Sequence, residues 1–178
     1  MDICVVGMGE VGRHISSVLV AEGNNVIVVD RNKSALNAVE LGLDVSAIAG
    51  NGATLHMLQR MGVANADLII AASSEDESNM LACIFAKNLG ARKVIARVSK
   101  PEHLQNDQGV IYNCHGIDLI VSPEMLTATE ITKHVRSIGA VMLEHFADNR
   151  IEIVQYILRE KNKLITHRIS AISEQYLS

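Results

Sequence analysis

A glycine-rich loop near the amino terminus is the strongest chemical signal in the sequence. Its glycines fit the pattern G-x-G-x-x-G: the first allows a tight turn, the second lets a phosphate approach the backbone, and the third lets a helix pack closely on a strand. An apolar run at residues 3–6 precedes the loop and a helical pattern follows it, so phosphates would bind amides at a helix amino terminus. The loop therefore predicts a nucleotide site with contacts from Gly7, Met8, Gly9, Glu10, Val11 and Gly12.

An acidic residue at the end of the second apolar run strengthens this interpretation. Asp30 follows residues 26–29 and lies eighteen positions after Gly12, close to the ~20 expected for a carboxylate that binds ribose hydroxyls. Its charge should disfavour a ribose 2′-phosphate, although the neighbouring Arg31 can offset that repulsion. The pattern does not distinguish NAD from ATP, ADP or AMP, because all of them contain adenosine and at least one phosphate.

Further candidate contacts lie at the ends of other predicted strands, where ligands of open α/β sheets bind. Asn51 follows the third strand, within a run of small residues that leaves room for an adenine ring. Ser73 and Ser74 follow the fourth strand, and Arg97 ends the fifth, where it can neutralise a phosphate. Two alternatives stay open: the serines as the N-cap of the next helix, and Arg97 as one partner of a surface or subunit-contact ion pair.

The sequence offers no catalytic or metal-binding constellation. The seven histidines are scattered, and C-x-x-C, H-E-x-x-H and G-x-S-x-G patterns are missing. Cys83 lies in an apolar helical stretch and is expected to be a core thiol. A hydride-transfer enzyme would also need a substrate pocket and an acid or base group. We therefore predict a protein that is not an enzyme, and keep as the alternative a fragment of an NAD-dependent oxidoreductase that lacks its catalytic domain.

The elements that position these residues alternate along the chain. Continuous apolar runs, typical of strands buried on both faces, predict parallel strands, and apolar positions at helical spacing predict helices between them. This alternation indicates an α/β protein with a Rossmann-type, doubly wound parallel sheet. Glycines after the helices are expected to adopt left-handed conformations: Gly23, Gly42, Gly62 and Gly90. The expected strands are 3–6, 26–29, 45–49, 68–72, 94–96 and 119–121. Helices are expected over 10–22 and about 75–89, and two more lie between them, the first marked by Leu36, Val39 and Leu41 and the second by Leu55, Leu58 and Met61.

The pattern changes after Ser122, the expected N-cap of a crossover helix at 123–138 with Pro123 in its first turn. Apolar stretches at 141–146 and 151–158 flank a polar turn and predict a hairpin. A short polar segment then leads to a weak helical pattern from Ser170. Residues 139–178 are too few to form a good core alone. We therefore expect this partial segment to be either a dimerisation appendage or, the interpretation we favour, the cut beginning of a second domain.

Composition limits the class of protein. The 178 residues carry a net charge of −4, which argues against nucleic acid as a partner because phosphate neutralisation needs clustered Lys and Arg. No apolar run reaches the ~18 residues that a membrane helix needs. Three scattered cysteines favour reduced thiols and a cytoplasmic location.

Together these motifs resemble the RCK (KTN) family of regulatory domains over about residues 1–160. The resemblance rests on the glycine loop, Asp30 and the segments GNGAT at 50–54, LQRMGVANAD at 58–67, SSEDESNM at 73–80 and IARV at 95–98. Two departures are Asn51, where many relatives carry Asp, and Glu10, where some carry Arg.

The resemblance implies a cytoplasmic regulatory subunit, peripheral on the inner face of the cell membrane, that gates a membrane potassium-uptake transporter in response to NAD(H) or ATP/ADP. It implies an RCK N-domain at 1–122, the crossover helix at 123–138 and the truncated start of an RCK C-subdomain at 139–178. Such domains form homodimers or larger rings, and the crossover helix would pack on a partner through Met125, Leu126, Ile131 and Val135. A redox-sensing repressor is the third possibility, but the sequence shows no helix pair with basic faces to bind DNA.

Overall fold

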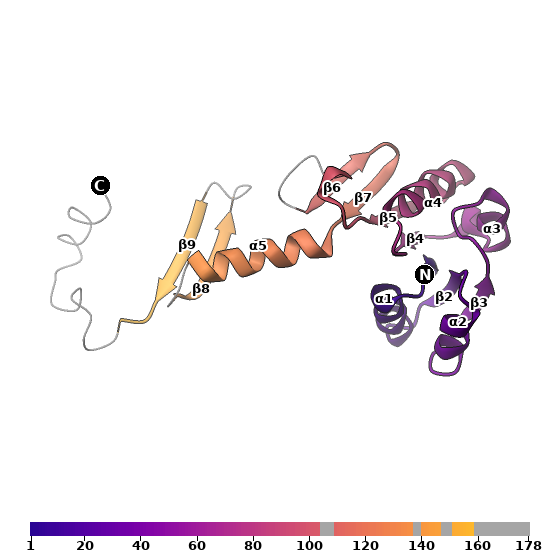
Figure 1. The fold of residues 1–178 in the computed structure, drawn as a ribbon, viewed down its shortest axis with the longest axis horizontal. Coiled ribbons are helices and arrows are strands. Elements are labelled where there is room, and N and C mark those ends of the chain that lie inside the picture. Colours follow the sequence, from indigo (N-terminus) through magenta and orange to yellow (C-terminus); the bar gives the residue numbers. More distant parts are fainter. Residues whose placement is uncertain (104–108, 137–139, 147–150, 159–178) are drawn as a thin grey trace. The chain divides into compact units, whose positions relative to one another are not determined.

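The computed structural model describes residues 1–103, 109–136, 140–146 and 151–158. The chain divides into two compact units, Met1–Thr127 and Ala128–Ser178, which are described separately. The first unit is an α/β sheet domain with helices on both faces (Figure 1). The second contains the end of a helix and a hairpin.

Seven strands form the sheet of the first unit, in the order β3-β2-β1-β4-β5-β7-β6. All neighbouring pairs from β3 to β7 are parallel, and β6 runs antiparallel to β7 at the edge. This order confirms the predicted Rossmann-type doubly wound sheet. The strands are β1 (Asp2–Val6), β2 (Asn25–Asp30), β3 (Ser46–Ala49), β4 (Leu68–Ala71), β5 (Lys93–Arg97), β6 (Val110–Cys114) and β7 (Ile117–Val121).

Strand β6 corrects the sequence analysis, which placed no strand there and expected a parallel sheet throughout. The predicted strand at 119–121 is β7, and β6 precedes it in a tight hairpin. Both Asn113 and His115 have positive φ at this turn, where neither residue type signals a hairpin strongly. As an edge strand, β6 is partly exposed, and Tyr112 and Asn113 interrupt the apolar pattern that marks the buried strands.

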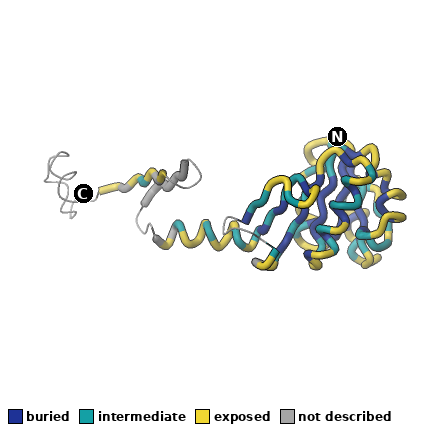
Figure 2. The backbone as a smooth tube through the Cα atoms, turned by 90° about the horizontal axis from the view of Figure 1, so that it is seen from above, coloured by how far each residue is buried: buried dark blue, intermediate teal, exposed yellow. Residues whose placement is uncertain are grey.

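Two apolar clusters pack against opposite faces of the sheet. Ile3 and Val5 of β1 belong to the cluster beneath α1 (Glu10–Ala21) and α2 (Lys33–Glu40). Cys4 and Val6 belong to the cluster beneath α3 (Leu55–Arg60) and α4 (Asp76–Leu89). Burial on both faces explains the continuous apolar runs, and Figure 2 shows the strands as the buried centre of this unit.

Helix ends follow local capping chemistry. The second helix, which Leu36 and Val39 mark in the sequence, begins at Lys33, where the Asn32 side chain accepts hydrogen bonds from the amides of Ser34 and Ala35. The expected left-handed conformation is confirmed at Gly23, Gly62 and Gly90. Gly42 has no positive φ, so that expectation is wrong there; the Leu43 amide instead donates to the carbonyl of Val39 at 2.8 Å and turns the chain.

Helix α5 (Pro123–Arg136) starts as the sequence predicts. The Ser122 hydroxyl accepts a hydrogen bond from the amide of Met125 at 3.3 Å, and Pro123 occupies the first turn. The predicted hairpin is present as antiparallel strands β8 (Ala140–Phe146) and β9 (Ile151–Tyr156). Its turn, the end of the crossover helix at 137–138 and the helical pattern from Ser170 lie outside the described residues.

Candidate functional site

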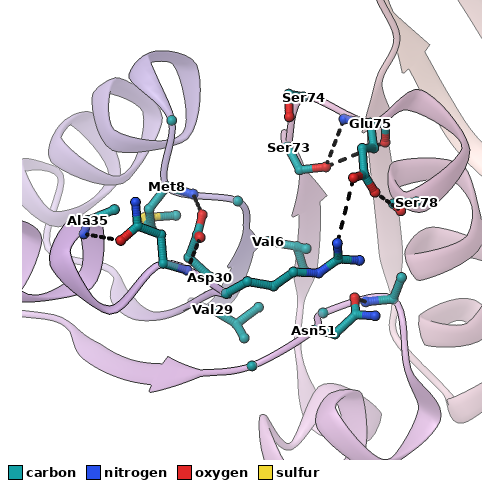
Figure 3. A pocket seen from close by; sticks show the side chains of 17 residues that line it. Val6, Met8, Val29, Asp30, Ala35, Asn51, Ser73, Ser74, Glu75 and Ser78 are labelled. Carbon is teal, nitrogen blue, oxygen red and sulfur yellow. Dashed lines mark hydrogen bonds and ion pairs between the residues drawn. The ribbon is translucent and has the colours of Figure 1, made fainter.

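A cavity of about 300 Å³ lies at the carboxyl ends of four adjacent parallel strands. The loops that follow β1, β2, β3 and β4 line it, at the point where the strand order reverses between β1 and β4. Ligands of open α/β sheets bind at this topological switch point. Figure 3 shows Met8 and Asp30 facing Ser73, Ser74 and Glu75 across the cavity.

The three loop glycines have different physical roles. Gly7 has a φ of +95°, and a Cβ there would lie 2.6 Å from the Ser73 backbone. A Cβ on Gly12 would lie 1.8 Å from the carbonyl oxygen of Gly7, so only glycine lets α1 approach the loop this closely. A Cβ on Gly9 would meet nothing within 4 Å, and Gly9 lines the cavity. Of the three, Gly9 alone therefore has open space where a side chain would begin.

The amino end of α1 completes the loop. Gly9 is the N-cap of α1, and no side chain caps this end of the helix. Its first amides therefore depend on water or on a bound group for their hydrogen bonds. A phosphate is suited to this position because it accepts such bonds and carries negative charge near the positive end of the helix dipole.

Asp30 ties the glycine loop to the end of β2. Its Oδ2 accepts a hydrogen bond from the Met8 amide at 2.6 Å, and its Oδ1 accepts one from the Asn32 amide at 2.7 Å (Figure 3). The carboxylate thus orders the loop besides lining the cavity. The sequence indicated a ribose-binding role and gave no sign of this structural one, because the bond joins two loops.

The candidates after β3 and β4 also lie at the cavity. Asn51 lines it, and its Oδ1 accepts a hydrogen bond from the Ala53 amide at 3.0 Å. Ser73 and Ser74 line the opposite side. The Ser73 hydroxyl donates to Oδ1 of the buried Asn79 at 2.7 Å. The N-cap of α4 is Glu75 and not Ser73 or Ser74, so the alternative role of the serines as an N-cap is wrong.

Four predicted contacts do not line the cavity: Glu10, Val11, Gly12 and Arg97. The Arg97 guanidinium donates to the Ser73 carbonyl at 3.2 Å and forms an ion pair with Glu124 of α5. The ion pair left open as an alternative is therefore present, within one chain. Through it the backbone beside the cavity is connected to the first turn of α5.

Glu75 contributes to the cavity in a way that was not predicted from the sequence. Arg31 and Glu75 both line the cavity and form an ion pair at 3.6 Å, and Ser78 donates to Glu75 at 2.8 Å. Glu75 reads in sequence as an acidic helix start favoured by the helix dipole. The useful signal would have been that the loops after β2 and β4 flank the loop after β1 and so carry their charges to one place.

The two buried thiols are poorly suited to act as nucleophiles. Burial raises the pKa of Cys83 to about 12 and that of Cys4 to about 11. Neither thiol ionises near neutral pH, which agrees with the expected core role of Cys83. Within the described residues, no group of three or more His, Cys, Asp or Glu side chains could hold a metal ion. None of the helices in that part of the chain has the length and apolar character needed to cross a membrane.

Comparison with known protein families decides the assignment. The family model of the TrkA-N domain matches residues 3–123. The chain belongs to the TrkA-N domain family. The match begins in β1 and ends at the start of α5, so it contains the sheet apart from Asp2 and every residue that lines the cavity.

Relatives of this TrkA-N domain chain carry a common name. It is 34% identical over 173 residues to the Trk system potassium uptake protein trkA homolog 1 of Methanosarcina mazei, covering 93% of the chain and 41% of that protein. It is 33% identical over 176 residues to the Trk system potassium uptake protein TrkA of Haemophilus influenzae, covering 98% of the chain and 38% of that protein. The chain thus spans about two fifths of the length of these relatives.

Solved structures confirm the fold. The TrkA-N domain of the inner membrane protein ybaL from Escherichia coli superposes with a TM-score of 0.63 at 18% identity, over 74% of this chain and 93% of that one. A GsuK channel bound to NAD superposes with a TM-score of 0.62 at 24% identity, over 83% of this chain and 25% of that one. Both support the Rossmann-type architecture of the TrkA-N domain.

Proposed function

We propose that this chain is the nucleotide-binding part of a regulatory subunit that gates a Trk-type membrane potassium transporter in response to NAD(H) or ATP/ADP. The observation that carries the proposal is the glycine loop, held by Asp30 at the switch point of the sheet. The loop occurs in a chain whose relatives are named as potassium-uptake proteins. Gating follows if the nucleotide binds two states of the assembly with different affinity.

The site residues fit an adenine nucleotide. Its phosphates would bind the backbone at Gly7–Gly9 and the amino end of α1, and its ribose hydroxyls would donate to Asp30. Asn51, Ser73 and Ser74 would supply further polar contacts around the cavity. Structures of similar fold have been solved with NAD, with ADP and with AMP, all of which share the adenosine phosphate that this arrangement suits.

A binding role suits this cavity better than catalysis. Its charged side chains are Asp30, Arg31 and Glu75, and each already has a partner within the chain. We therefore propose that the chain is not an enzyme. No observation favours the alternative, a fragment of an NAD-dependent oxidoreductase.

The proposal includes assembly at the inner face of the cell membrane, as a homodimer or larger ring. Leu126, Ile131 and Val135 of α5 are 36%, 58% and 60% exposed in the isolated chain. Apolar side chains this exposed on one helix suit contact with a second copy. The potassium transporter subunit would be the membrane partner.

Replacing Asp30 with alanine should weaken the binding of NAD and of ATP by about 1–3 kcal/mol. The variant removes the acceptor for the ribose hydroxyls and also releases the Met8 amide from its 2.6 Å bond. Isothermal titration calorimetry measures the change, and Asp44→Ala is the matched control because Asp44 is exposed and outside the cavity. Equal affinity in Asp30→Ala and the control would show that Asp30 does not bind the ribose.

Growth at low potassium tests the proposed function. The full-length protein, expressed with a compatible membrane subunit, should restore growth of a bacterium deficient in potassium uptake. Gly9→Val in the same protein should fail to restore growth or should alter its dependence on potassium, because the nucleotide can no longer bias the assembly. If Gly9→Val restores growth as well as the wild-type protein does, nucleotide binding does not gate the transporter. Dehydrogenase activity lost on mutation of a cavity residue would overturn the regulatory role.

A further inference from the structure

An ion pair spans the candidate site. Arg31, in the loop after β2, lies 3.6 Å from Glu75, in the loop after β4. The strand order places β2 and β4 on either side of β1, so the pair bridges the two loops that flank the glycine loop. Figure 3 shows Glu75 on the side of the cavity opposite Asp30.

Both oxygens of the Glu75 carboxylate are engaged. Oε1 faces Arg31, and Oε2 accepts a hydrogen bond from the Ser78 hydroxyl at 2.8 Å. Ser78 lies in the first turn of α4 and also lines the cavity. The serine therefore fixes the direction in which Glu75 presents its charge to Arg31.

The position of Arg31 gives this pair a chemical consequence. Arg31 directly follows Asp30, the proposed ribose-binding carboxylate, and an arginine there is the group that accommodates a 2′-phosphate in dinucleotide sites. Guanidinium groups bind phosphate through charge-assisted bonds, provided that they are not already paired. In this structure the Arg31 guanidinium is already paired with Glu75.

The net charge of the side chains that line the cavity also disfavours a 2′-phosphate. The ionisable side chains that line the cavity are Asp30 and Glu75, which are negative, and Arg31, which is positive. A 2′-phosphate would thus enter a site with one more negative than positive charge, and like charges placed together oppose binding.

We propose that Glu75, held by Ser78, is a specificity-determining residue that occupies Arg31 and makes the site reject nucleotides with a 2′-phosphate. This inference rests on the proposed nucleotide-binding function. Both side chains of the pair are 57% exposed, so the pair adds little to folding stability. Its effect is on the choice between NAD and NADP.

The test is the ratio of NADP to NAD affinity, measured by calorimetry on the whole chain. Glu75→Gln should raise this ratio about tenfold, the scale of one gained charge-assisted contact. The control Glu22→Gln should leave both affinities unchanged, since Glu22 is exposed and does not line the cavity. The double variant Arg31→Ala, Glu75→Gln should lose the gain, because the freed guanidinium is its source.

Each other outcome has a distinct meaning. NAD binding to the wild-type chain with an unchanged ratio in Glu75→Gln would overturn the role of Glu75 and leave the proposed function intact. A gain that persists without Arg31 would also overturn it, since the removed charge alone would then explain the effect. Binding of ATP or ADP without NAD or NADP in any variant would reject the inference only. Absence of binding by all four nucleotides would overturn both.

Discussion

Replacing Gly9 with valine is expected to weaken nucleotide binding at least about 100-fold, which is about 2.7 kcal/mol, while leaving the chain folded. A Cβ on Gly9 meets no atom within 4 Å, so the side chain costs little in the free protein. The same open space is where the phosphates of a nucleotide would approach the backbone at the start of α1. Calorimetry gives the affinity, and circular dichroism with a thermal melt reports the fold.

Gly42→Val is the matched control for this variant. Gly42 also has no positive φ, its nearest contact for a Cβ is at 3.8 Å, and it lies outside the cavity at Gly9. The same change at Gly42 should leave nucleotide affinity within about twofold of wild type, since it removes no contact with the ligand. Equal affinities in the two folded variants would show that the ligand does not pass Gly9.

Asp76→Ala is expected to lower the free energy of unfolding by about 3 kcal/mol, since it removes a buried carboxylate and leaves three hydrogen-bond donors without their acceptor. Asp76 is fully buried at the start of α4. Its carboxylate accepts hydrogen bonds from the amides of Ser99 and Lys100 and from the Ser99 hydroxyl, at 2.8–2.9 Å. Urea titration measures the change, and Asp44→Ala, which removes an exposed carboxylate, should cost under about 0.5 kcal/mol. Similar losses in the two variants would contradict the anchoring role of Asp76.

The stabilisation by Asp76 should also depend on pH. Burial raises the pKa of this carboxyl, but the bonds from Lys100 and Ser99 outweigh that effect and hold the pKa below its ordinary value of 3.8. A group with a lowered pKa stabilises the folded state fully above its unfolded pKa and loses that effect as the pH falls through the folded value. The difference between wild type and Asp76→Ala should therefore be constant near neutral pH and shrink below about pH 4.

Sequence reasoning was most successful where one local pattern determined the structure. The buried parallel strands follow from continuous apolar runs, and α5 begins at its predicted Ser122-Pro123 signal. It failed at β6, because an exposed edge strand needs no continuous apolar run. It gave no start for α2, although Asn32 is a recognisable capping residue.

In the candidate site, too, features of one local motif were predictable and contacts between distant residues were not. The conformational role of Gly7 and the packing role of Gly12 follow from one motif, and the geometry agrees with both. The bond from Met8 to Asp30 and the pair of Arg31 with Glu75 join residues 22 and 44 positions apart, and only the folded sheet brings them together. Arg97 lies at a strand end as predicted, but its guanidinium forms an ion pair with Glu124.

A titration of the wild-type chain with NAD, NADH, ATP and ADP, followed through its backbone amide NMR signals, tests the central claim most directly. We predict saturable shifts with at least one of these nucleotides, concentrated at Gly7–Glu10, at Asp30–Asn32 and in the loops that follow β3 and β4. A second hollow, between α1 and α2, is lined by Arg13, His14 and Leu43 among others and provides an internal comparison. Shifts confined to that hollow, or no saturable shift with any of the four nucleotides, would contradict a nucleotide site at the switch point of the sheet.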